Sequence, residues 1–145
     1  MSGFSYPVLV ADVGGTNCRL SLVEDAGVPY RPLARIGTGS HATPEAALEA
    51  VLVTLTQRPR SAVFAVAGPL EGRSAQLTNA NWHFDGPQLG RALGLEQGLL
   101  VNDFEAQAAS LAVLGAGDVT TLVAGAPEPD GVRLVLGPGT GFGAA

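Results

Sequence analysis

The stretch that decides the fold spans residues 8–24 and reads VLVADVGGTNCRLSLVE. Five of its first six residues, all but Asp12, are apolar, which is typical of a buried β-strand, and residues 19–24 alternate well enough for a second strand. Polar and glycine residues lie between the two runs: Asp12, Gly14, Gly15, Thr16 and Asn17. The stretch therefore predicts a strand, a tight turn and a returning strand.

The chemistry of this turn suits a bound phosphate. Gly14 and Gly15 permit positive φ and close approach of the backbone, so successive N–H groups can form a nest for an anion. Thr16 and Asn17 add side-chain donors, and Asp12 is suited to hold a hydrated Mg²⁺ beside a polyphosphate. A hairpin turn with polar decoration is the alternative interpretation, because Gly-Gly is a common hairpin turn.

Composition narrows the class of protein. The 145 residues are 46% hydrophobic and 14% charged, which predicts one globular domain with a real core. The net charge of −5 and the absence of a basic run argue against nucleic acid or an anionic membrane as the main partner. All eight basic residues are arginine, which excludes a Walker A loop, a Schiff-base enzyme and a protein-kinase lysine.

Two further features concern cysteine and targeting. Cys18 is the single cysteine, so it has no internal disulfide partner, and we expect a small packing residue at the start of a strand and not a nucleophile. The sequence shows no signal peptide and no apolar run of about 18 residues. These features predict a cytoplasmic protein.

The rest of the chain alternates between helix and strand patterns. Strands are predicted at residues 30–36, 61–66, 73–77, 98–101, 119–124 and 132–136. Helices are predicted after Thr43, after Asp85 and after Asp103, with the second ending at Gly94. This order predicts an α/β fold whose mixed sheet is antiparallel on one side and parallel on the other, flanked by helices.

Three candidate sites fall after predicted strands, where α/β sheets gather their ligands. They are Asp12, the pair Asn102-Asp103, and the glycine-rich residues 137–143. Asp103, at the start of a helix, is well placed as a general base, although the helix N-terminus stabilises its charge and weakens it as a base. A simple helix N-cap is the alternative role for Asp103, and the two roles are compatible.

The glycine-rich stretch GPGTGFG covers residues 137–143 and suits a phosphate-cradling turn, with Thr140 as an extra donor. A flexible tail is the alternative interpretation of this stretch.

Residues 78–82 read TNANW and form a polar loop with the only tryptophan. Asn79 and Asn81 could bind sugar hydroxyls, and Trp82 could pack on a sugar face or in the core. Loop capping by asparagine is the more ordinary explanation.

Taken in order, these motifs resemble the glucokinase family of bacterial sugar kinases, within the superfamily of sugar kinases, heat-shock protein 70 and actin. Residues 12–19 (DVGGTNCR) look like the family's first phosphate motif, and residues 137–141 (GPGTG) look like its second. Residues 78–82 (TNANW) are similar to its Thr-Asn-x-x-Trp loop, and residues 102–104 (NDF) to its catalytic Asn-Asp-Phe. The resemblance spans almost the whole chain.

The resemblance implies a ribonuclease-H-like sheet and transfer of the ATP γ-phosphate to the 6-hydroxyl of glucose. Asp103 would take the hydroxyl proton, and the sugar hydroxyls would be held by Asn102, Asn81 and Asn79. The phosphates would be lined by Gly14, Gly15, Thr16, Asn17, Gly137, Gly139, Thr140 and Gly141. Asp12 would lie near Mg²⁺, and ATP and glucose would be the partners.

Members of the family are roughly twice as long, and their second domain supplies further sugar and adenosine contacts. We therefore expect residues 1–145 to be the N-terminal ATPase-like domain, weakly active or inactive alone, with exposed apolar surface that favours a homo-oligomer. The alternatives are a non-catalytic sugar sensor on the same fold and a kinase for another hexose.

Overall fold

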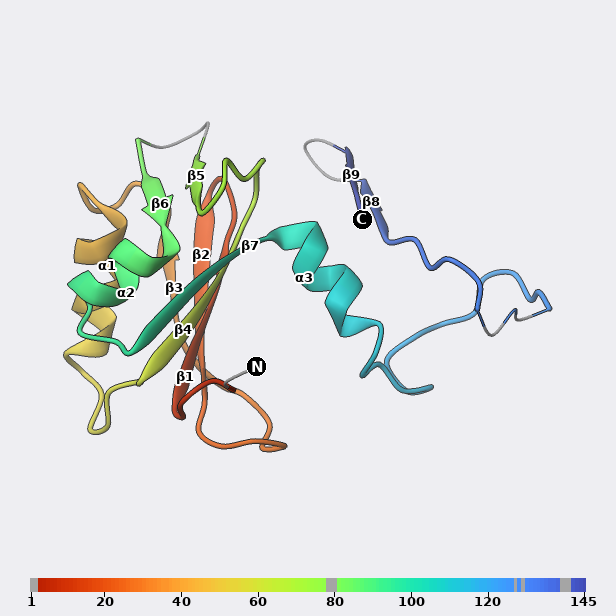
Figure 1. Cartoon of the computed structure of the whole chain (residues 1–145), viewed down its shortest axis with the longest axis horizontal. Helices are drawn as coiled ribbons and strands as arrows, with labels where there is room; N and C mark the ends of the chain where they lie inside the picture. Colours follow the sequence, from red (N-terminus) through yellow and green to blue (C-terminus); the bar gives the residue numbers. More distant parts are fainter. Residues whose placement is uncertain (1–2, 78–80, 127, 129, 139–141) are drawn as a thin grey trace. The chain divides into compact units, whose positions relative to one another are not determined.

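The computed structural model describes residues 3–77, 81–126, 128, 130–138 and 142–145. By its internal contacts the chain divides into two compact units, Met1–Asp103 and Phe104–Ala145. The first unit contains a five-stranded sheet and two helices that lie against one face of it (Figure 1).

The strands of this sheet lie in the order β3-β2-β1-β4-β7. The antiparallel half consists of β1 (Val8–Val13), β2 (Asn17–Val23) and β3 (Arg31–Gly37). The parallel half adds β4 (Ser61–Val66) next to β1 and β7 (Gln97–Asn102) at the edge. This arrangement confirms the predicted mixed sheet, since β1 pairs antiparallel with β2 on one side and parallel with β4 on the other.

Both helices of the first unit begin at a side-chain cap. The Thr43 hydroxyl accepts a hydrogen bond from the Ala46 amide at 3.2 Å at the start of α1 (Pro44–Leu52). An Asp85 carboxylate oxygen accepts one from the Gln88 amide at 2.7 Å at the start of α2 (Gly86–Ala92). These caps satisfy amide groups that the first turn of a helix leaves unpaired, which is why the helices begin there.

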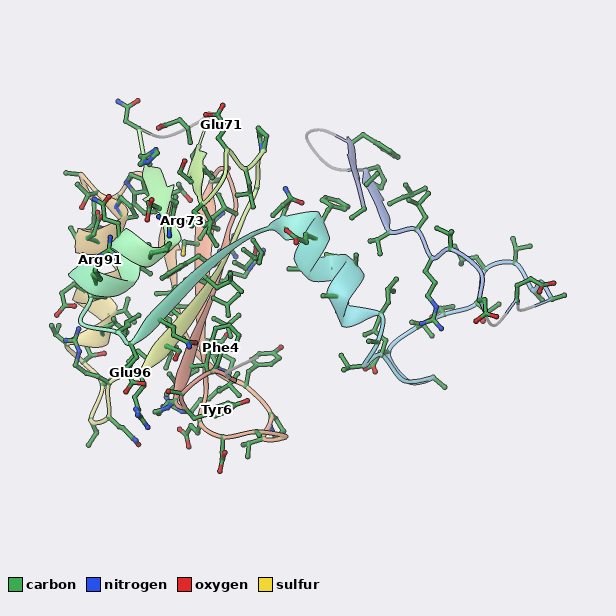
Figure 2. All side chains as sticks on the ribbon, in the orientation of Figure 1. Phe4, Tyr6, Glu71, Arg73, Arg91 and Glu96 are labelled. Carbon is green, nitrogen blue, oxygen red and sulfur yellow. The ribbon has the colours of Figure 1, made fainter. Side chains whose placement is uncertain are left out.

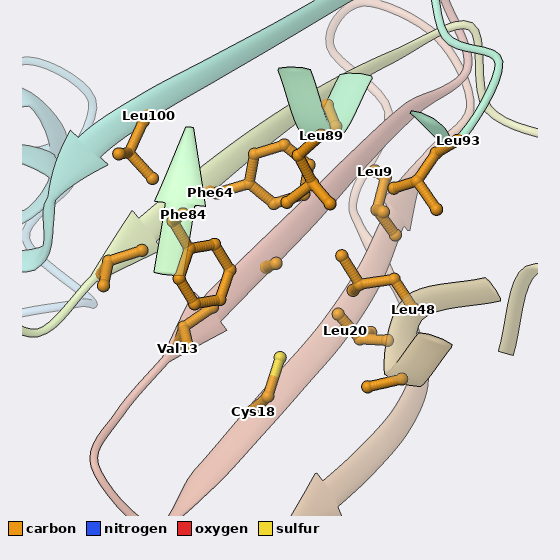
Figure 3. Packing of buried hydrophobic residues seen from close by; sticks show 14 of the residues in the cluster. Leu9, Val13, Cys18, Leu20, Leu48, Phe64, Phe84, Leu89, Leu93 and Leu100 are labelled. Atoms are coloured by element: carbon orange, nitrogen blue, oxygen red, sulfur yellow. The ribbon is translucent and has the colours of Figure 1, made fainter. Parts of the chain in front are cut away.

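The core lies between the two helices and the sheet (Figure 3). Alternate residues of β1, β2 and β4 point into it, so its wall is the face that carries Leu9, Leu20 and Phe64. Trp82 is also buried, with its ring edge-on to Phe84 at 6.2 Å between centroids. Of the two roles predicted for Trp82, the structure shows packing in the core.

The first unit also contains a short hairpin, and the sequence predicted only one of its two strands. Its strands are β5 (Ser74–Gln76) and β6 (His83–Asp85), which pair antiparallel. Residues 73–77 were expected to be a strand, but β6 was not, because three residues give too little alternation to read.

The second unit contains α3 (Asp103–Ser110), apart from its first residue, and a hairpin of β8 (Leu136–Pro138) and β9 (Phe142–Ala144). The predicted strand at 119–124 is wrong, and the one at 132–136 is displaced toward the C-terminus. Leu122 and Val123 are 91% and 88% exposed. Strand-forming residues need a neighbouring strand to pair with, and in the described part of this unit only the β8–β9 hairpin supplies one.

In the described part of the chain, no helix is both long enough and apolar enough to cross a membrane.

Candidate functional site

The carboxyl ends of three neighbouring strands meet at one edge of the sheet in the first unit. In the register, Asp12 lies opposite Ala65, and Ala65 lies opposite Val101. Asn102 therefore lies one row beyond Asp12 and two strands away, about 10 Å across the sheet at the usual strand spacing. The structure thus brings Asp12 and Asn102 to the same edge, as the strand pattern predicted, whereas Gly137 belongs to the second unit.

The turn between β1 and β2 is closed by backbone and side-chain bonds. The Gly14 amide donates to the Asn17 carbonyl at 2.9 Å. Thr38 donates twice to this turn, from its hydroxyl to the Gly14 carbonyl and from its amide to the Thr16 carbonyl, both at 2.9 Å. Two carbonyl oxygens that would repel an anion are therefore already engaged by Thr38.

Sequence reasoning missed Thr38, because it lies in a loop without a recognisable motif.

The backbone conformation of Gly14 and Gly15 differs from the one that the sequence predicted. Neither Gly14 nor Gly15 is among the described glycines with positive φ, so the turn lacks the left-handed residue that a nest requires. What these glycines offer is the absence of a side chain, which lets a ligand approach the half-exposed backbone closely.

Asp12 is the candidate metal residue, and it forms an ion pair with Arg19. The Arg19 Nη1 and Asp12 Oδ2 atoms are 2.8 Å apart, and both side chains are more than half exposed. The described residues contain no group of three or more metal-ligating side chains. A single accessible carboxylate nevertheless fits Mg²⁺, which keeps most of its waters and commonly uses one protein carboxylate together with substrate phosphates.

The Asn102-Asp103 pair lies where β7 passes into α3. The Asn102 side chain donates from Nδ2 to the Gly68 carbonyl at 2.8 Å, which links the ends of β7 and β4. Asp103 is the first residue of α3 and is half-buried. A half-buried carboxylate at a strand end can both contact a substrate and be partly shielded from water, so the role of Asp103 as a general base stays a prediction, as does its alternative role as a helix N-cap.

The turn that contains Gly68 was not singled out in the sequence, although a signal was present. Residues 67–69 (AGP) follow a buried central strand directly. Gly68 has φ of +146°, which only glycine adopts easily, and its carbonyl is what holds Asn102.

The asparagine loop is described only in part. Asn79 lies outside the described residues, and Asn81 is exposed. Asn81 lines a small hollow of about 210 Å³ near the starts of α1 and α2, together with Thr43, Glu45, His83, Asp85 and Gln88. Next to it, the Trp82 indole N–H donates to the His41 carbonyl at 3.0 Å, which anchors the loop to the chain ahead of α1.

The second glycine-rich stretch lies in the second unit. Gly137 is within β8 and pairs with Gly143 in β9, so it does not follow the strand as predicted. A Cβ built on Gly137 would lie 2.5 Å from Cζ of Phe104, and Gly143 would clash with the same ring. These two glycines therefore make room for Phe104, while Gly139, Thr140 and Gly141 lie outside the described residues.

Cys18 behaves as the sequence predicted. It is 1% exposed, and burial, helped by the negative charge of Asp12, raises the pKa of its thiol to about 12. The thiolate is the nucleophilic form, so Cys18 is a packing residue at neutral pH.

Another hollow lies at the opposite end of the sheet, around the beginning of β7. It encloses about 490 Å³, and Phe4, Arg91 and Glu96 contribute to its wall (Figure 2). Because it lies at the amino ends of the parallel strands, it is remote from Asp12 and Asn102 and carries none of the predicted site residues.

Comparison with known proteins gives a consistent result. The family model described as Glucokinase matches residues 9–145. The chain is 46% identical over 143 residues to a glucokinase of Sinorhizobium medicae, and 40% identical over 144 residues to one of Brucella abortus. Each match covers 98% of this chain but only 42% of the relative, so the chain spans less than half the length of these proteins.

Solved structures show the same likeness. A glucokinase from an Antarctic psychrotroph superposes with a TM-score of 0.78 at 33% identity, over 95% of this chain and 45% of that one. A Streptomyces griseus glucokinase of the ROK family, in complex with glucose and AMPPNP, gives 0.61 at 20% identity, over 95% of this chain and 43% of the other. At 20% identity the second match supports the fold alone.

Proposed function

Because this chain belongs to the glucokinase family, we propose that it is the N-terminal portion of an ATP-dependent glucokinase. The proposed reaction transfers the γ-phosphoryl group of ATP to the 6-hydroxyl of glucose. One observation carries the proposal within the chain itself. The turn of residues 14–17 between β1 and β2, called the phosphate-type turn below, and the Asn102-Asp103 pair at the end of β7 lie at the same edge of one sheet.

Asp103 is the proposed general base. As the 6-hydroxyl oxygen attacks the γ-phosphorus, the new O–P bond forms, the bond to the ADP oxygen breaks, and the hydroxyl proton passes to the Asp103 carboxylate. The half-buried position of Asp103 supports this role, because a substrate hydroxyl held there would replace water beside the carboxylate.

Asn102 and Asn81 are the proposed sugar contacts, with Asn79 in the same loop. The bond from Asn102 to the Gly68 carbonyl fixes the plane of its amide, so this contact is oriented before glucose binds. Oriented groups matter in phosphoryl transfer, because catalysis there depends mostly on positioning and on charge stabilisation.

The phosphates of ATP are the proposed ligands of the turn formed by Gly14, Gly15, Thr16 and Asn17. The second glycine-rich stretch would contribute through Gly137, Gly139, Thr140 and Gly141. Asp12 would hold Mg²⁺ through its carboxylate, and the ion, when bound, neutralises charge on the phosphate oxygens. A Streptomyces griseus glucokinase of the same fold binds AMPPNP, an ATP analogue, and we extend this type of donor to the present chain as part of the proposal.

The relatives are more than twice as long as this chain, so we propose that a second domain completes the cleft. Residues 1–145 alone would then be weakly active or inactive, because half a cleft cannot close over the substrate and exclude water. A cytoplasmic location and self-association of the isolated chain belong to the same proposal.

The test is the formation of sugar 6-phosphate from ATP, Mg²⁺ and glucose, followed by mass spectrometry. The chain and the full-length protein that carries it are assayed side by side, each with an Asp103→Asn variant. Product from the full-length protein that is lost in the variant supports the proposal. A full-length protein that binds glucose without turnover would instead be a sugar sensor, and turnover of another hexose in preference to glucose would change the substrate.

A further inference from the structure

Three charged residues form a row across the antiparallel half of the sheet, next to the phosphate-type turn. Asp12 lies directly opposite Arg19, and Arg19 lies directly opposite Arg35 on the edge strand β3. Residues that face each other on neighbouring strands point to the same side of the sheet. The row lines one groove of about 640 Å³, to which all three side chains contribute.

The bonds within this row are uneven. Arg19 is paired with the Asp12 carboxylate at 2.8 Å. Arg35 instead donates from Nε to the side-chain oxygen of Asn17 at 3.2 Å, and among the described residues no carboxylate forms an ion pair with it. The row therefore contains two guanidinium groups but only one carboxylate, so it has a surplus positive charge.

Such an arrangement costs stability, because like charges directly opposite each other on a sheet repel. A second arginine beside Arg19 is therefore not explained by the folding of the sheet. A negatively charged ligand at the neighbouring turn would offset this cost, and Arg35 reaches the end of that turn through its hydrogen bond to Asn17, the first residue of β2.

We propose that Arg35 is a positioning residue for the polyphosphate of the nucleotide. It holds the Asn17 side chain at the end of the turn. Its positive charge also repels the guanidinium group of Arg19, which therefore stays close to Asp12 and the phosphates. This inference rests on the proposed function and adds to it a residue outside all four motifs. Arg35 has no expected contact with the sugar, so its effect should be confined to the nucleotide.

The experiment measures binding of AMPPNP with Mg²⁺, and separately of glucose, to the full-length protein by calorimetry. Arg35→Gln removes the charge, and Arg35→Lys keeps it. Arg31→Gln is the matched control, because Arg31 is an exposed arginine of the same strand whose partner, Glu24 at 3.1 Å, lies at the far end of the sheet. Urea unfolding of every variant shows whether the fold is kept.

We expect Arg35→Gln to weaken nucleotide binding about fivefold to tenfold, because Arg35 is exposed and acts on the phosphates through Asn17 and through its charge. Arg35→Lys should recover part of this loss, and Arg31→Gln should bind like the wild type. Glucose affinity should stay unchanged in all three. In the assay of turnover, KM for ATP should rise while KM for glucose stays constant.

A second measurement tests the route through Asn17. If Arg35 acts by holding Asn17, then adding Arg35→Gln to Asn17→Ala should weaken nucleotide binding by less than it does in the wild type. Full additivity would overturn that route. Equal nucleotide affinity in Arg35→Gln and Arg31→Gln would overturn the whole inference while leaving the kinase proposal intact, whereas a wild type that binds no nucleotide would overturn both.

Discussion

The Asn102 side-chain amide donates from Nδ2 to the main-chain carbonyl of Gly68 at 2.8 Å. This bond joins two strand ends that are 34 residues apart in the sequence, next to the proposed catalytic aspartate. It gives Asn102 a structural role in addition to its proposed contact with the sugar. The two roles can be separated experimentally.

Asn102→Ala should destabilise the fold by about 1–2 kcal/mol, because the part-buried Gly68 carbonyl loses its donor. Asn102→Asp should cost at least as much at neutral pH, since a carboxylate cannot donate and would face a carbonyl oxygen. Urea unfolding measures both. Asn81→Ala is the control, because this asparagine is exposed, and an equal loss of stability there would remove the special role of Asn102.

If the full-length protein is the proposed kinase, Asp12→Asn should raise the Mg²⁺ concentration that it needs for half-maximal activity by at least about tenfold, because the one proposed protein carboxylate on the ion is lost. Steady-state rates over a magnesium titration measure this. Glu24→Gln provides the control, since Glu24 also forms an exposed ion pair with an arginine, at 3.1 Å to Arg31. If the two variants need similar Mg²⁺ concentrations for half-maximal activity, Asp12 does not bind the ion and its ion pair with Arg19 is purely structural.

The buried thiol of Cys18 should make the fold sensitive to alkaline pH. The pKa of Cys18 is raised from 9.0 to about 12, so the folded state favours the neutral thiol. Its contribution to stability is complete below pH 9 and is lost as the pH rises toward 12. We expect the urea midpoint to fall between pH 9 and pH 11 more steeply in the wild type than in Cys18→Ala. Parallel pH profiles would contradict this.

Reagent access gives an independent check on the same residue. At pH 8 the native chain should react with a thiol-specific disulfide reagent much more slowly than the urea-unfolded chain, because Cys18 is 1% exposed. Equal rates would show that this part of the sheet opens freely.

Gly98→Ala should destabilise the chain by about 3 kcal/mol or more, as overpacking against rigid groups does. A Cβ on Gly98 would collide with the Gly86 carbonyl and approach Cα of Gly90 to 3.1 Å, and both partners are backbone of α2. Backbone of a packed helix cannot move aside as a flexible side chain can. Gly117→Ala is the control, since nothing lies within 4 Å of a Cβ there. In thermal melts, Gly98→Ala should unfold at a clearly lower temperature than Gly117→Ala.

The ion pair of Glu49 and Arg58 should contribute a small, acid-sensitive stability. Hydrogen bonding from Arg58 lowers the pKa of Glu49. The contribution is therefore present above the ordinary glutamate pKa of about 4.3 and is lost as the pH falls through the lowered value. The side chains are 43% and 42% exposed, so water screening limits it to less than about 1 kcal/mol. Glu49→Gln should flatten the stability profile between pH 5 and pH 3, and an unchanged profile would assign acid sensitivity to other carboxylates.

Much of the fold could be predicted because its signals are local. The apolar run of β1, the caps Thr43 and Asp85 and the stop at Gly94 depend on neighbours within a few residues, and all of them are confirmed. The strand expected at 119–124 failed because a strand exists only with a partner, and partners are not a local property.

The sequence by itself determined the order along the chain of the strands in the five-stranded sheet and of the two helices that cover it, the family, and the residue types at the candidate site. The elements follow from periodicity and capping chemistry, and the family follows from the resemblance of short motifs, so all of this information lies within short segments. Only the tertiary structure decided which atoms meet. It placed Asp12 and Asn102 at one edge, turned Trp82 into the core, gave Asn102 the Gly68 carbonyl and set Arg35 opposite Arg19. Such contacts depend on strand register and on packing between residues distant in sequence. The local sequence alone does not determine them, because the same side chains are compatible with many other registers and packing arrangements.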